Sequence, residues 1–141
     1  ILDGIGDGAC LLRAISRKTF GDPANHAQVR HDIVQHIQHN PGTFYTDISN
    51  GFGNDPIRIQ GSPPSLYYSL QDYLSIMAQP SAYGGYIEIA AASQLYGLTI
   101  EVVIAGTPFA PPPTPPQQNT LHVLFHPNSL HYSTLSAVYT A

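Results

Sequence analysis

The sequence predicts an α+β fold in which a small β-sheet is flanked by helices. Two observations favour this class. Through most of the chain, apolar residues recur three or four positions apart, as they do on the buried face of a helix. After residue 97 the pattern changes to runs of β-branched residues, which are typical of strands. With 141 residues, of which 43% are hydrophobic, the chain can bury a core of its own as a single domain.

Two helices are predicted first. A helix over residues 10–20 follows a glycine-rich start and ends at a Gly-Asp-Pro sequence. A second helix spans roughly residues 25–39, because Val29, Ile33 and Ile37 lie four residues apart on one face. The Asn-Pro-Gly sequence that follows is expected to stop it.

Residues 43–64 are predicted to form an irregular connection, because Gly, Asn, Ser and Pro are dense there. A loop of this length in a compact domain is often functional. Four apolar side chains of this segment could contact a partner or could simply pack beneath the loop: Phe44, Tyr45, Phe52 and Ile57. Both interpretations stay open from the sequence.

Two further helices are expected before the pattern changes. Over residues 65–77, Leu66, Leu70 and Leu74 share one side. Over residues 85–96, small alanines permit close packing of a helix against its neighbours. Its inward residues are expected to be Ile89, Ala92, Ser93 and Tyr96.

Three strands are expected at the end of the chain, at residues 98–104, 121–126 and 131–138. Residues 106–119 must form a loop between the first two strands, because six prolines there remove backbone donors and fix φ. The predicted helices therefore come first and the predicted strands last, and this segregation favours an α+β fold.

Charge and composition narrow the function classes. The net charge is −4 and only 10% of residues are charged, so nothing favours binding to nucleic acid. No segment is long and apolar enough to cross a bilayer. The single cysteine cannot form an internal disulfide, which favours an intracellular, cytoplasmic location, or the host cytosol for a viral or bacterial effector; a secreted protein with a reactive thiol is the alternative. Because the sequence begins with Ile1, we expect residues 1–141 to be excised from a longer chain.

Cys10 lies at the start of the first predicted helix, directly after Gly-Asp-Gly-Ala. At a helix N-terminus, unpaired N–H groups and the positive end of the dipole stabilise thiolate over thiol, and thiolate is the nucleophile. The preceding glycines allow backbone amides to approach a reacting carbonyl, as an oxyanion hole requires. The alternative is a buried cysteine that serves as a small hydrophobic residue.

A thiolate nucleophile needs a base, and the chain has seven histidines. Those of the second helix do not form one tight face, so a solvated surface explains them. His122 and His126 share one side of a predicted strand, which we expect to face outward. His131 follows a turn and opens the last strand, where a helix N-terminus could meet it. No second cysteine or His-Glu-x-x-His spacing supports a metal site, and no cofactor is expected.

Four blocks of the sequence together resemble the ovarian-tumour (OTU) family of cysteine proteases, which are mostly deubiquitinases. GDGACLLRAIS is similar to the family's nucleophile motif, and HAQVRHDIVQHIQHNP to its second helix. YLSIMAQPSAYGGYIEIAAASQLYGLTIEVV resembles the stretch that commonly reads Trp-Gly-Gly-x-x-Glu and then enters a strand. LHYSTL resembles the terminal histidine segment. The blocks follow the family's order and cover most of the chain.

The resemblance implies a papain-like α+β fold and mechanism. Cys10 would attack the carbonyl of an isopeptide or peptide bond, with His131 as general base and then acid. Asp7 would shape the loop whose backbone amides hold the oxyanion. Four residues would contact the substrate: Tyr83, Gly84, Gly85 and Tyr132.

Three positions depart from the family's pattern. Leu12 replaces an aromatic residue, and Tyr83 replaces the usual tryptophan, as a smaller aromatic with a polar tip. Ser133 stands where an Asn or Asp usually orients the imidazole. A serine hydroxyl can accept from His131, but it carries no charge to stabilise imidazolium. The alternatives are a catalytic dyad, an orienting group from Asp7 or Asn128, or a Ser133 that is merely a surface residue.

The resemblance implies ubiquitin or a ubiquitin-like protein as the partner. The tail of ubiquitin ends in Arg-Leu-Arg-Gly-Gly, so it needs a narrow channel, which Gly84 and Gly85 could line, and acidic neighbours. Candidate acids are Asp47, Asp55 and Glu101, each of which could equally be an ordinary surface charge. The segment 43–64 is the expected ubiquitin-contacting arm.

Three functions remain open from the sequence. The chain could be a deubiquitinase, a related viral protease that cleaves its own polyprotein, or a non-catalytic module that binds ubiquitin. Intact Cys10 and His131 argue against the third function, whereas Ser133 lends it some weight.

Overall fold

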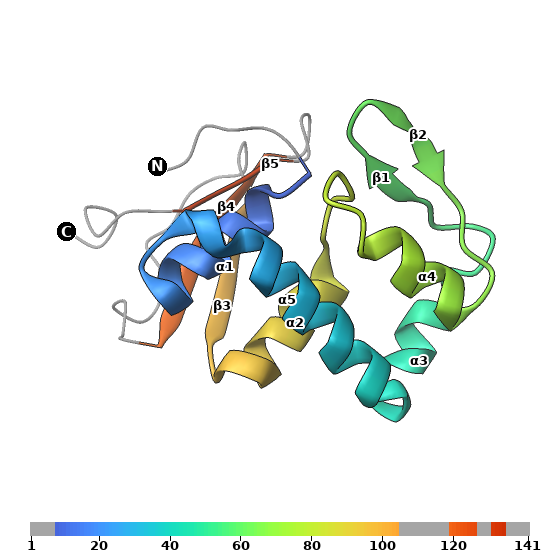
Figure 1. The fold of residues 1–141 in the computed structure, drawn as a ribbon, viewed down its shortest axis with the longest axis horizontal. Coiled ribbons are helices and arrows are strands. Elements are labelled where there is room, and N and C mark those ends of the chain that lie inside the picture. Colours follow the sequence, from blue (N-terminus) through green and yellow to red (C-terminus); the bar gives the residue numbers. More distant parts are fainter. Residues whose placement is uncertain (1–7, 105–118, 127–130, 135–141) are drawn as a thin grey trace.

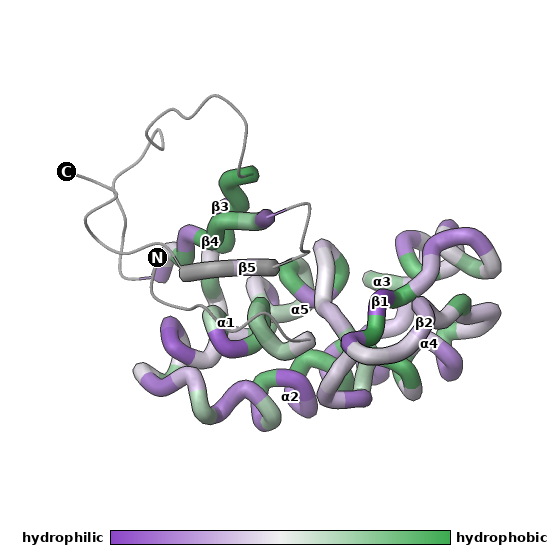
Figure 2. Tube along the Cα trace, turned by 90° about the horizontal axis from the view of Figure 1, so that it is seen from above, coloured by the Kyte–Doolittle hydropathy of each residue, from purple (hydrophilic) through white to green (hydrophobic). Residues whose placement is uncertain are grey.

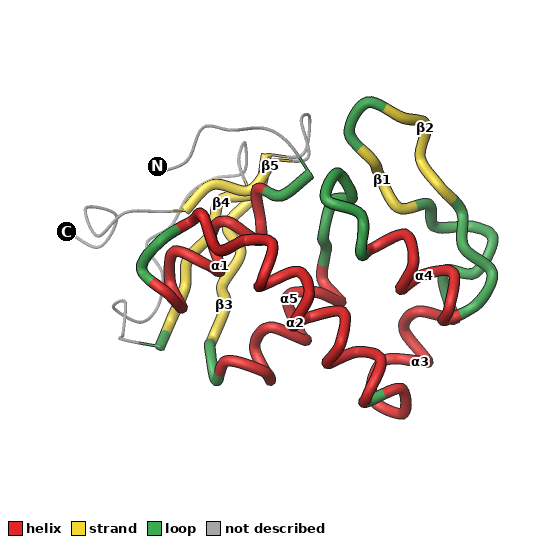
Figure 3. Tube along the Cα trace, viewed as in Figure 1, coloured by secondary structure: helices red, strands yellow, loops and turns green. Residues whose placement is uncertain are grey.

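The computed structural model describes residues 8–104, 119–126 and 131–134. The first residues with Asp7, nearly all of the proline-rich segment 106–119, Asn128 and the predicted strand beyond Thr134 lie outside the described residues. Helices and two small sheets form the described part, so the predicted α+β class is confirmed (Figures 1 and 3). The elements have these bounds: α1 Cys10–Phe20, α2 His26–His39, α3 Pro41–Ser49, α4 Leu70–Met77, α5 Tyr86–Tyr96, β1 Ile57–Ile59, β2 Ser62–Ser65, β3 Thr99–Ile104, β4 Thr120–His126 and β5 His131–Thr134.

The elements gather at two ends of the molecule. At one end, α1 packs against a sheet of strand order β3-β4-β5; at the other lie α3, α4 and the β1–β2 hairpin (Figure 1). Helices α2 and α5 run between the two ends and pack against each other, with α2 contacting α1, α3 and α4. Figure 2 shows hydrophilic and hydrophobic stretches alternating along α1 and α2, as expected of helices with one buried face.

The three-stranded sheet brings the last strand beside the first helix. Strands β3 and β4 are parallel, whereas β4 and β5 are antiparallel, with His126 opposite His131 and Phe125 opposite Tyr132. Helix α1 packs on β5 and, to a smaller extent, on β4. The start of α1 therefore meets the strand that His131 opens.

Helices α1 and α2 agree with the predicted bounds to within one residue. Helix α1 buries Leu11, Leu12 and Ile15 and ends at Gly21, whose φ of 76° is the left-handed value that glycine adopts without strain. A short 3₁₀ turn over Pro23–Asn25, capped by the Asp22 carboxylate, leads into α2.

The prediction of an irregular connection over residues 43–64 is wrong. The Asn-Pro-Gly sequence does not end the helical region, because Pro41 begins α3, a position where its missing N–H costs no hydrogen bond. Phe44 and Ile48 are buried on one face of α3. The β1–β2 hairpin follows, and its burial alternates over β1 while β2 is mostly exposed.

The predicted helix over residues 65–77 is too long. Ser65 belongs to β2, Leu66 is exposed, and the helix begins only at Leu70. Ser69 is the reason, since its side chain accepts a hydrogen bond from the Asp72 N–H and so caps α4. The predicted helix over residues 85–96 is confirmed, as α5.

His122 does not face outward. It is buried, and its Nε2 lies 2.9 Å from Glu101 Oε1 on the neighbouring strand. The parallel register places Glu101 opposite His122, so the two side chains meet on one face of the sheet. Among the described residues, no helix has the length and hydropathy that a membrane span requires.

Candidate active site

Cys10 is the first residue of α1, at the end of the helix where N–H groups lack intrahelical acceptors. The residue before the helix is Ala9, whose methyl side chain cannot cap those groups. From β5, the backbone N–H of Tyr132 donates a hydrogen bond to Cys10 Sγ across 3.3 Å. The sulfur therefore lies where the helix N-terminus meets the last described strand.

This environment is polar on one side and apolar on the other. The side chain of Cys10 is only 1% exposed and belongs to the hydrophobic core, as expected of a packing residue. Its sulfur nevertheless accepts an N–H bond at the positive end of a helix. Both polar neighbours favour thiolate, the nucleophilic form, whereas burial of the sulfur favours the neutral thiol.

His131 is the residue before the one that contacts the sulfur. It opens β5, so its backbone lies one residue from the Tyr132 contact with Cys10. The side chains of His131 and Ser133, together with Asp7 and Asn128, lie outside what the structure describes. Their catalytic and orienting roles stay predictions.

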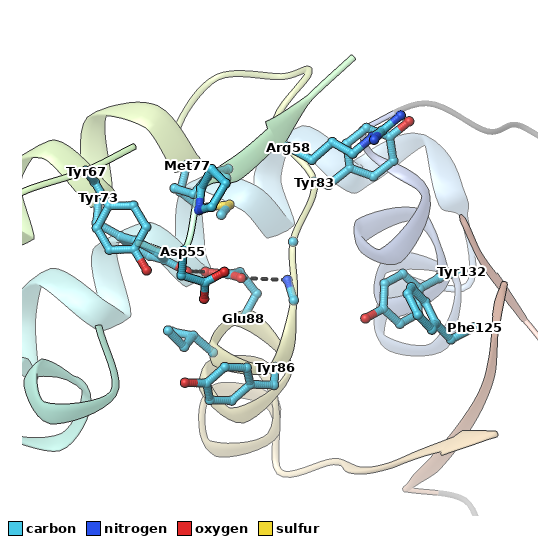
Figure 4. Close-up of a pocket in the computed structure, with 15 residues that line it drawn as sticks. Asp55, Arg58, Tyr67, Tyr73, Met77, Tyr83, Tyr86, Glu88, Phe125 and Tyr132 are labelled. Carbon is cyan, nitrogen blue, oxygen red and sulfur yellow. Dashed lines mark hydrogen bonds between the residues drawn. The ribbon is translucent and has the colours of Figure 1, made fainter. Parts of the chain in front are cut away.

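A cavity of about 230 Å³ opens between the two ends of the molecule. All four predicted substrate-binding residues line it: Tyr83, Gly84, Gly85 and Tyr132. In Figure 4, Arg58 and Tyr83 lie at one end of the cavity, Tyr132 and Phe125 on one side, and Asp55 and Glu88 near the middle. Tyr132 joins the cavity to the thiol, because it lines the first and its backbone contacts the second.

The two glycines on this wall have different surroundings. A Cβ at Gly84 would lie 3.2 Å from Leu11 Cδ2 and 3.4 Å from Glu88 Cβ, so a side chain there would crowd α1 and α5. A Cβ at Gly85 would meet no atom within 4 Å. Gly84 thus lets the wall approach the helix that carries Cys10.

The candidate acids separate into two groups. Asp55 lines the cavity, and Asp47 lies on the exposed side of α3. Burial first, and then the negative charges of Asp47 and Asp55, raise the pKa of Tyr86, which also lines the cavity. Glu101 is not part of this group, because it pairs with His122 in the sheet.

A buried carboxylate supports the glycine wall; it is the glutamate of the Gly-Gly-x-x-Glu pattern, to which the sequence analysis assigned no role. Glu88 of α5 is almost completely buried; its Oε1 accepts from the Gly85 N–H at 2.7 Å, and its Oε2 accepts from the Tyr73 hydroxyl. Burial raises the pKa of Glu88, while the bonds from Tyr73 and Gly85 lower it. A glutamate three residues after a helix cap is a capping-box pattern, which is the signal that could have found it.

Arg58 is the second residue that sequence patterns did not reveal. From β1, its guanidinium lies 6.0 Å from the centre of the Tyr83 ring, within reach of a cation–π interaction. The cavity wall therefore carries an acid, Asp55, and a base, Arg58, from neighbouring parts of the chain. Within the described residues, no three His, Cys, Asp or Glu side chains converge as a metal site would need.

Comparison with known proteins identifies the relatives of this chain. The model of the OTU-like cysteine protease family matches residues 5–139. One relative is the ovarian tumor domain-containing deubiquitinating enzyme 9 of Arabidopsis thaliana, which is 26% identical over 98 residues, 70% of this chain and 23% of that protein. The chain spans between 15% and 23% of the length of the first three such relatives.

Solved structures share the fold. The OTU domain of OTUD1 superposes with a TM-score of 0.67 at 22% identity, over 96% of this chain and 84% of that domain. An OTU deubiquitinase of Wolbachia pipientis wMel, bound to ubiquitin, superposes with a TM-score of 0.68 at 17% identity, over 97% of this chain and 95% of that one. At these identities, the likeness establishes the fold.

Proposed function

Since this chain belongs to the OTU-like cysteine protease family, we propose that it is a deubiquitinase that hydrolyses the peptide or isopeptide bond at the carboxyl end of ubiquitin. The plant relative is named as a deubiquitinating enzyme, and the Wolbachia structure of the same fold holds ubiquitin. The observation that carries the proposal is the hydrogen bond to Cys10 Sγ from the backbone N–H of Tyr132, a residue that also lines the cavity with the other predicted substrate residues.

In the proposed reaction, His131 takes the thiol proton and Cys10 Sγ attacks the carbonyl carbon of the terminal glycine of ubiquitin. Backbone amides of residues 7–10 would stabilise the oxyanion, because N–H donors near the position where negative charge develops lower the barrier. The protonated imidazole then gives its proton to the leaving amine, which leaves a thioester. Water, deprotonated by the imidazole, hydrolyses the thioester and restores the thiol.

Two features of the cavity support the tail of ubiquitin as its ligand. Its Gly-Gly end would pass along Gly84 and Gly85, where bulky side chains are absent. Its arginines would meet Asp55, with Asp47 adding negative potential from α3. Segment 43–64, which includes most of α3 and of the β1–β2 hairpin, would contact the body of ubiquitin.

A fluorogenic ubiquitin amide tests the activity directly. The wild-type chain should release the fluorophore and the Cys10→Ala variant should not, while both bind ubiquitin. Binding without hydrolysis by the wild type would contradict the proposal and favour a non-catalytic module. Faster cleavage of a peptide from the protein's own flanking sequence than of ubiquitin would favour a polyprotein protease.

A further inference from the structure

Arg30 is a buried arginine at the middle of α2, and its side chain is only 5% exposed. A buried guanidinium needs acceptors for its N–H groups, since an unsatisfied buried charge strongly destabilises the fold. Arg30 satisfies its donors with main-chain carbonyls. Its Nη1 donates to Met77 O at 2.8 Å, and its Nη2 donates to Pro80 O at 3.0 Å, Ala82 O at 3.0 Å and Gly8 O at 3.3 Å.

These carbonyls belong to two segments with different tasks in the proposed reaction. Three of them lie in residues 77–82, the segment that leads directly into Tyr83, Gly84 and Gly85. The fourth, Gly8 O, lies two residues before Cys10. One planar guanidinium therefore connects the turn before the nucleophile to the wall of the substrate cavity.

The same two segments also touch without Arg30. A Cβ at Gly8 would lie 2.2 Å from Ser81 O, so only glycine allows the turn to sit against that backbone. The other edge of the segment is paired with β1 and the residue after it, through Tyr83 N to Arg58 O and Gln60 N to Ser81 O, each 2.9 Å. Residues 77–83 are thus held on one edge by the hairpin and on the other by Arg30 and Gly8.

We propose that Arg30 is a positioning residue that sets the distance between the Cys10 turn and the Tyr83–Gly85 wall, so that bound substrate reaches the sulfur. The inference rests on the proposed function. Lysine cannot replace arginine in this role, because one ammonium cannot donate to four carbonyls spread over two segments. The role is geometric, so it concerns reaction with a substrate that fills the cavity and not the intrinsic reactivity of the thiol.

Two reactions of the Cys10 thiol in the Arg30→Lys variant distinguish a change in the position of the substrate wall from a change in the intrinsic reactivity of the thiol. Hydrolysis of the ubiquitin amide requires the wall to hold the substrate carbonyl within reach of the sulfur. Displacement of the reacting groups by about 1 Å can lower the reaction rate about 100-fold. We expect kcat to fall at least about tenfold with little change in KM. Alkylation of Cys10 by iodoacetamide does not involve the Tyr83–Gly85 wall, so its rate should stay within about threefold of wild type. Arg17→Lys, on α1, is the matched control and should behave as wild type in both reactions.

A second variant changes the contact between the Cys10 turn and residues 77–82 at Gly8 and not at Arg30. It keeps the inference testable if Arg30→Lys does not fold. Gly8→Ala should reproduce the loss of kcat, because its Cβ would push the turn away from Ser81. Gly42→Ala, where a Cβ meets nothing within 4 Å, is its control. Thermal unfolding above the assay temperature shows that each variant is folded.

Three outcomes overturn the inference. Wild-type rates of ubiquitin hydrolysis by a folded Arg30→Lys or Gly8→Ala variant overturn this inference and leave the proposed function standing. Equal losses in hydrolysis and alkylation also overturn it, because they would mean that Arg30 acts on the thiol or on the fold. An inactive wild-type protein overturns the proposed function, and this inference with it.

Discussion

At the scale of single residues, the polar groups around the cavity have separable tasks. Asp55 faces the cavity, where it would meet the tail of the substrate, whereas Glu88 is enclosed and its oxygens are already bonded to Gly85 and Tyr73. Substitution of Asp55 should therefore change the affinity for the substrate. Loss of a hydrogen bond to Glu88 should change the free energy of unfolding.

Asp55→Asn should raise KM for the ubiquitin amide by about threefold to tenfold and leave kcat almost unchanged, since an exposed ion pair contributes about 0.2–1 kcal/mol and a short one with arginine somewhat more. The difference from wild type should shrink in high salt. Steady-state kinetics at two ionic strengths measure it. An unchanged KM at low salt would remove Asp55 from the substrate site.

Tyr73→Phe should lower the free energy of unfolding by about 1.5–3 kcal/mol, because the buried Glu88 carboxylate loses a hydrogen bond. Urea denaturation at neutral pH measures this change. Tyr68→Phe is the control, since that side chain is 65% exposed, and it should change stability little. Equal effects of the two substitutions would contradict the assigned network.

At the scale of elements, agreement with the sequence follows the strength of the local pattern. Helices α1 and α2 carry periodic apolar faces and clear ends, so their bounds were predictable. The bounds of α5 were predictable from the glycines at its two ends, Gly85 and Gly97, but its buried face was not, because its buried residues are Ile87, Glu88, Ala91 and Ala92. The β1–β2 hairpin was not, because Pro63 and Pro64 in β2 read as a loop, although an edge strand tolerates proline. The pairing of this hairpin with residues 81–83 is tertiary and leaves no local signal.

The start of α4 gives a test at this scale. If Ser69 caps the helix, Ser69→Ala should lower the free energy of unfolding by about 1 kcal/mol. Were the helix to begin at residue 65, as the apolar spacing suggests, alanine at 69 would lie inside it and stabilise it slightly. Ser75→Ala, on the exposed side of α4, is the internal control in the same urea denaturation series.

Some residues of the candidate site were also predictable from the sequence and others were not. Cys10 at a helix start and the Tyr-Gly-Gly wall were predictable, since glycine spacing and family resemblance mark them. Arg30 was not, because its partners are backbone carbonyls between 22 and 52 residues away in the chain. Every residue carries a backbone carbonyl, so the residue type does not indicate which carbonyls will accept a hydrogen bond from Arg30.

At the scale of the whole molecule, buried tyrosines link stability to alkaline pH. Burial, then the charges of Cys10 and Glu88, raise the pKa of Tyr132 from 10.0 to about 12, and burial, then Asp55, raises that of Tyr67 equally. A tyrosine whose pKa is raised on folding makes its full contribution to stability at pH values below its pKa in the unfolded state. That contribution is lost as pH rises from 10 to 12.

The free energy of unfolding should therefore fall steeply between pH 10 and pH 12 and vary less between pH 8 and pH 9.5. Urea denaturation across this range, with tyrosinate absorbance as a second readout, measures it. Tyr132→Phe should make the fall shallower. Tyrosines that all titrate near pH 10 would contradict the burial described.

The account depends on Cys10 reaching the carboxyl end of ubiquitin in the cavity beside Tyr132. The most direct measurement is incubation with ubiquitin that carries a carboxy-terminal electrophile, followed by intact-mass and peptide mass spectrometry. The account predicts one ubiquitin per chain, attached to the peptide that contains Cys10, and none on Cys10→Ala. Absence of an adduct on the folded wild-type protein, or an adduct that persists in Cys10→Ala, would contradict it.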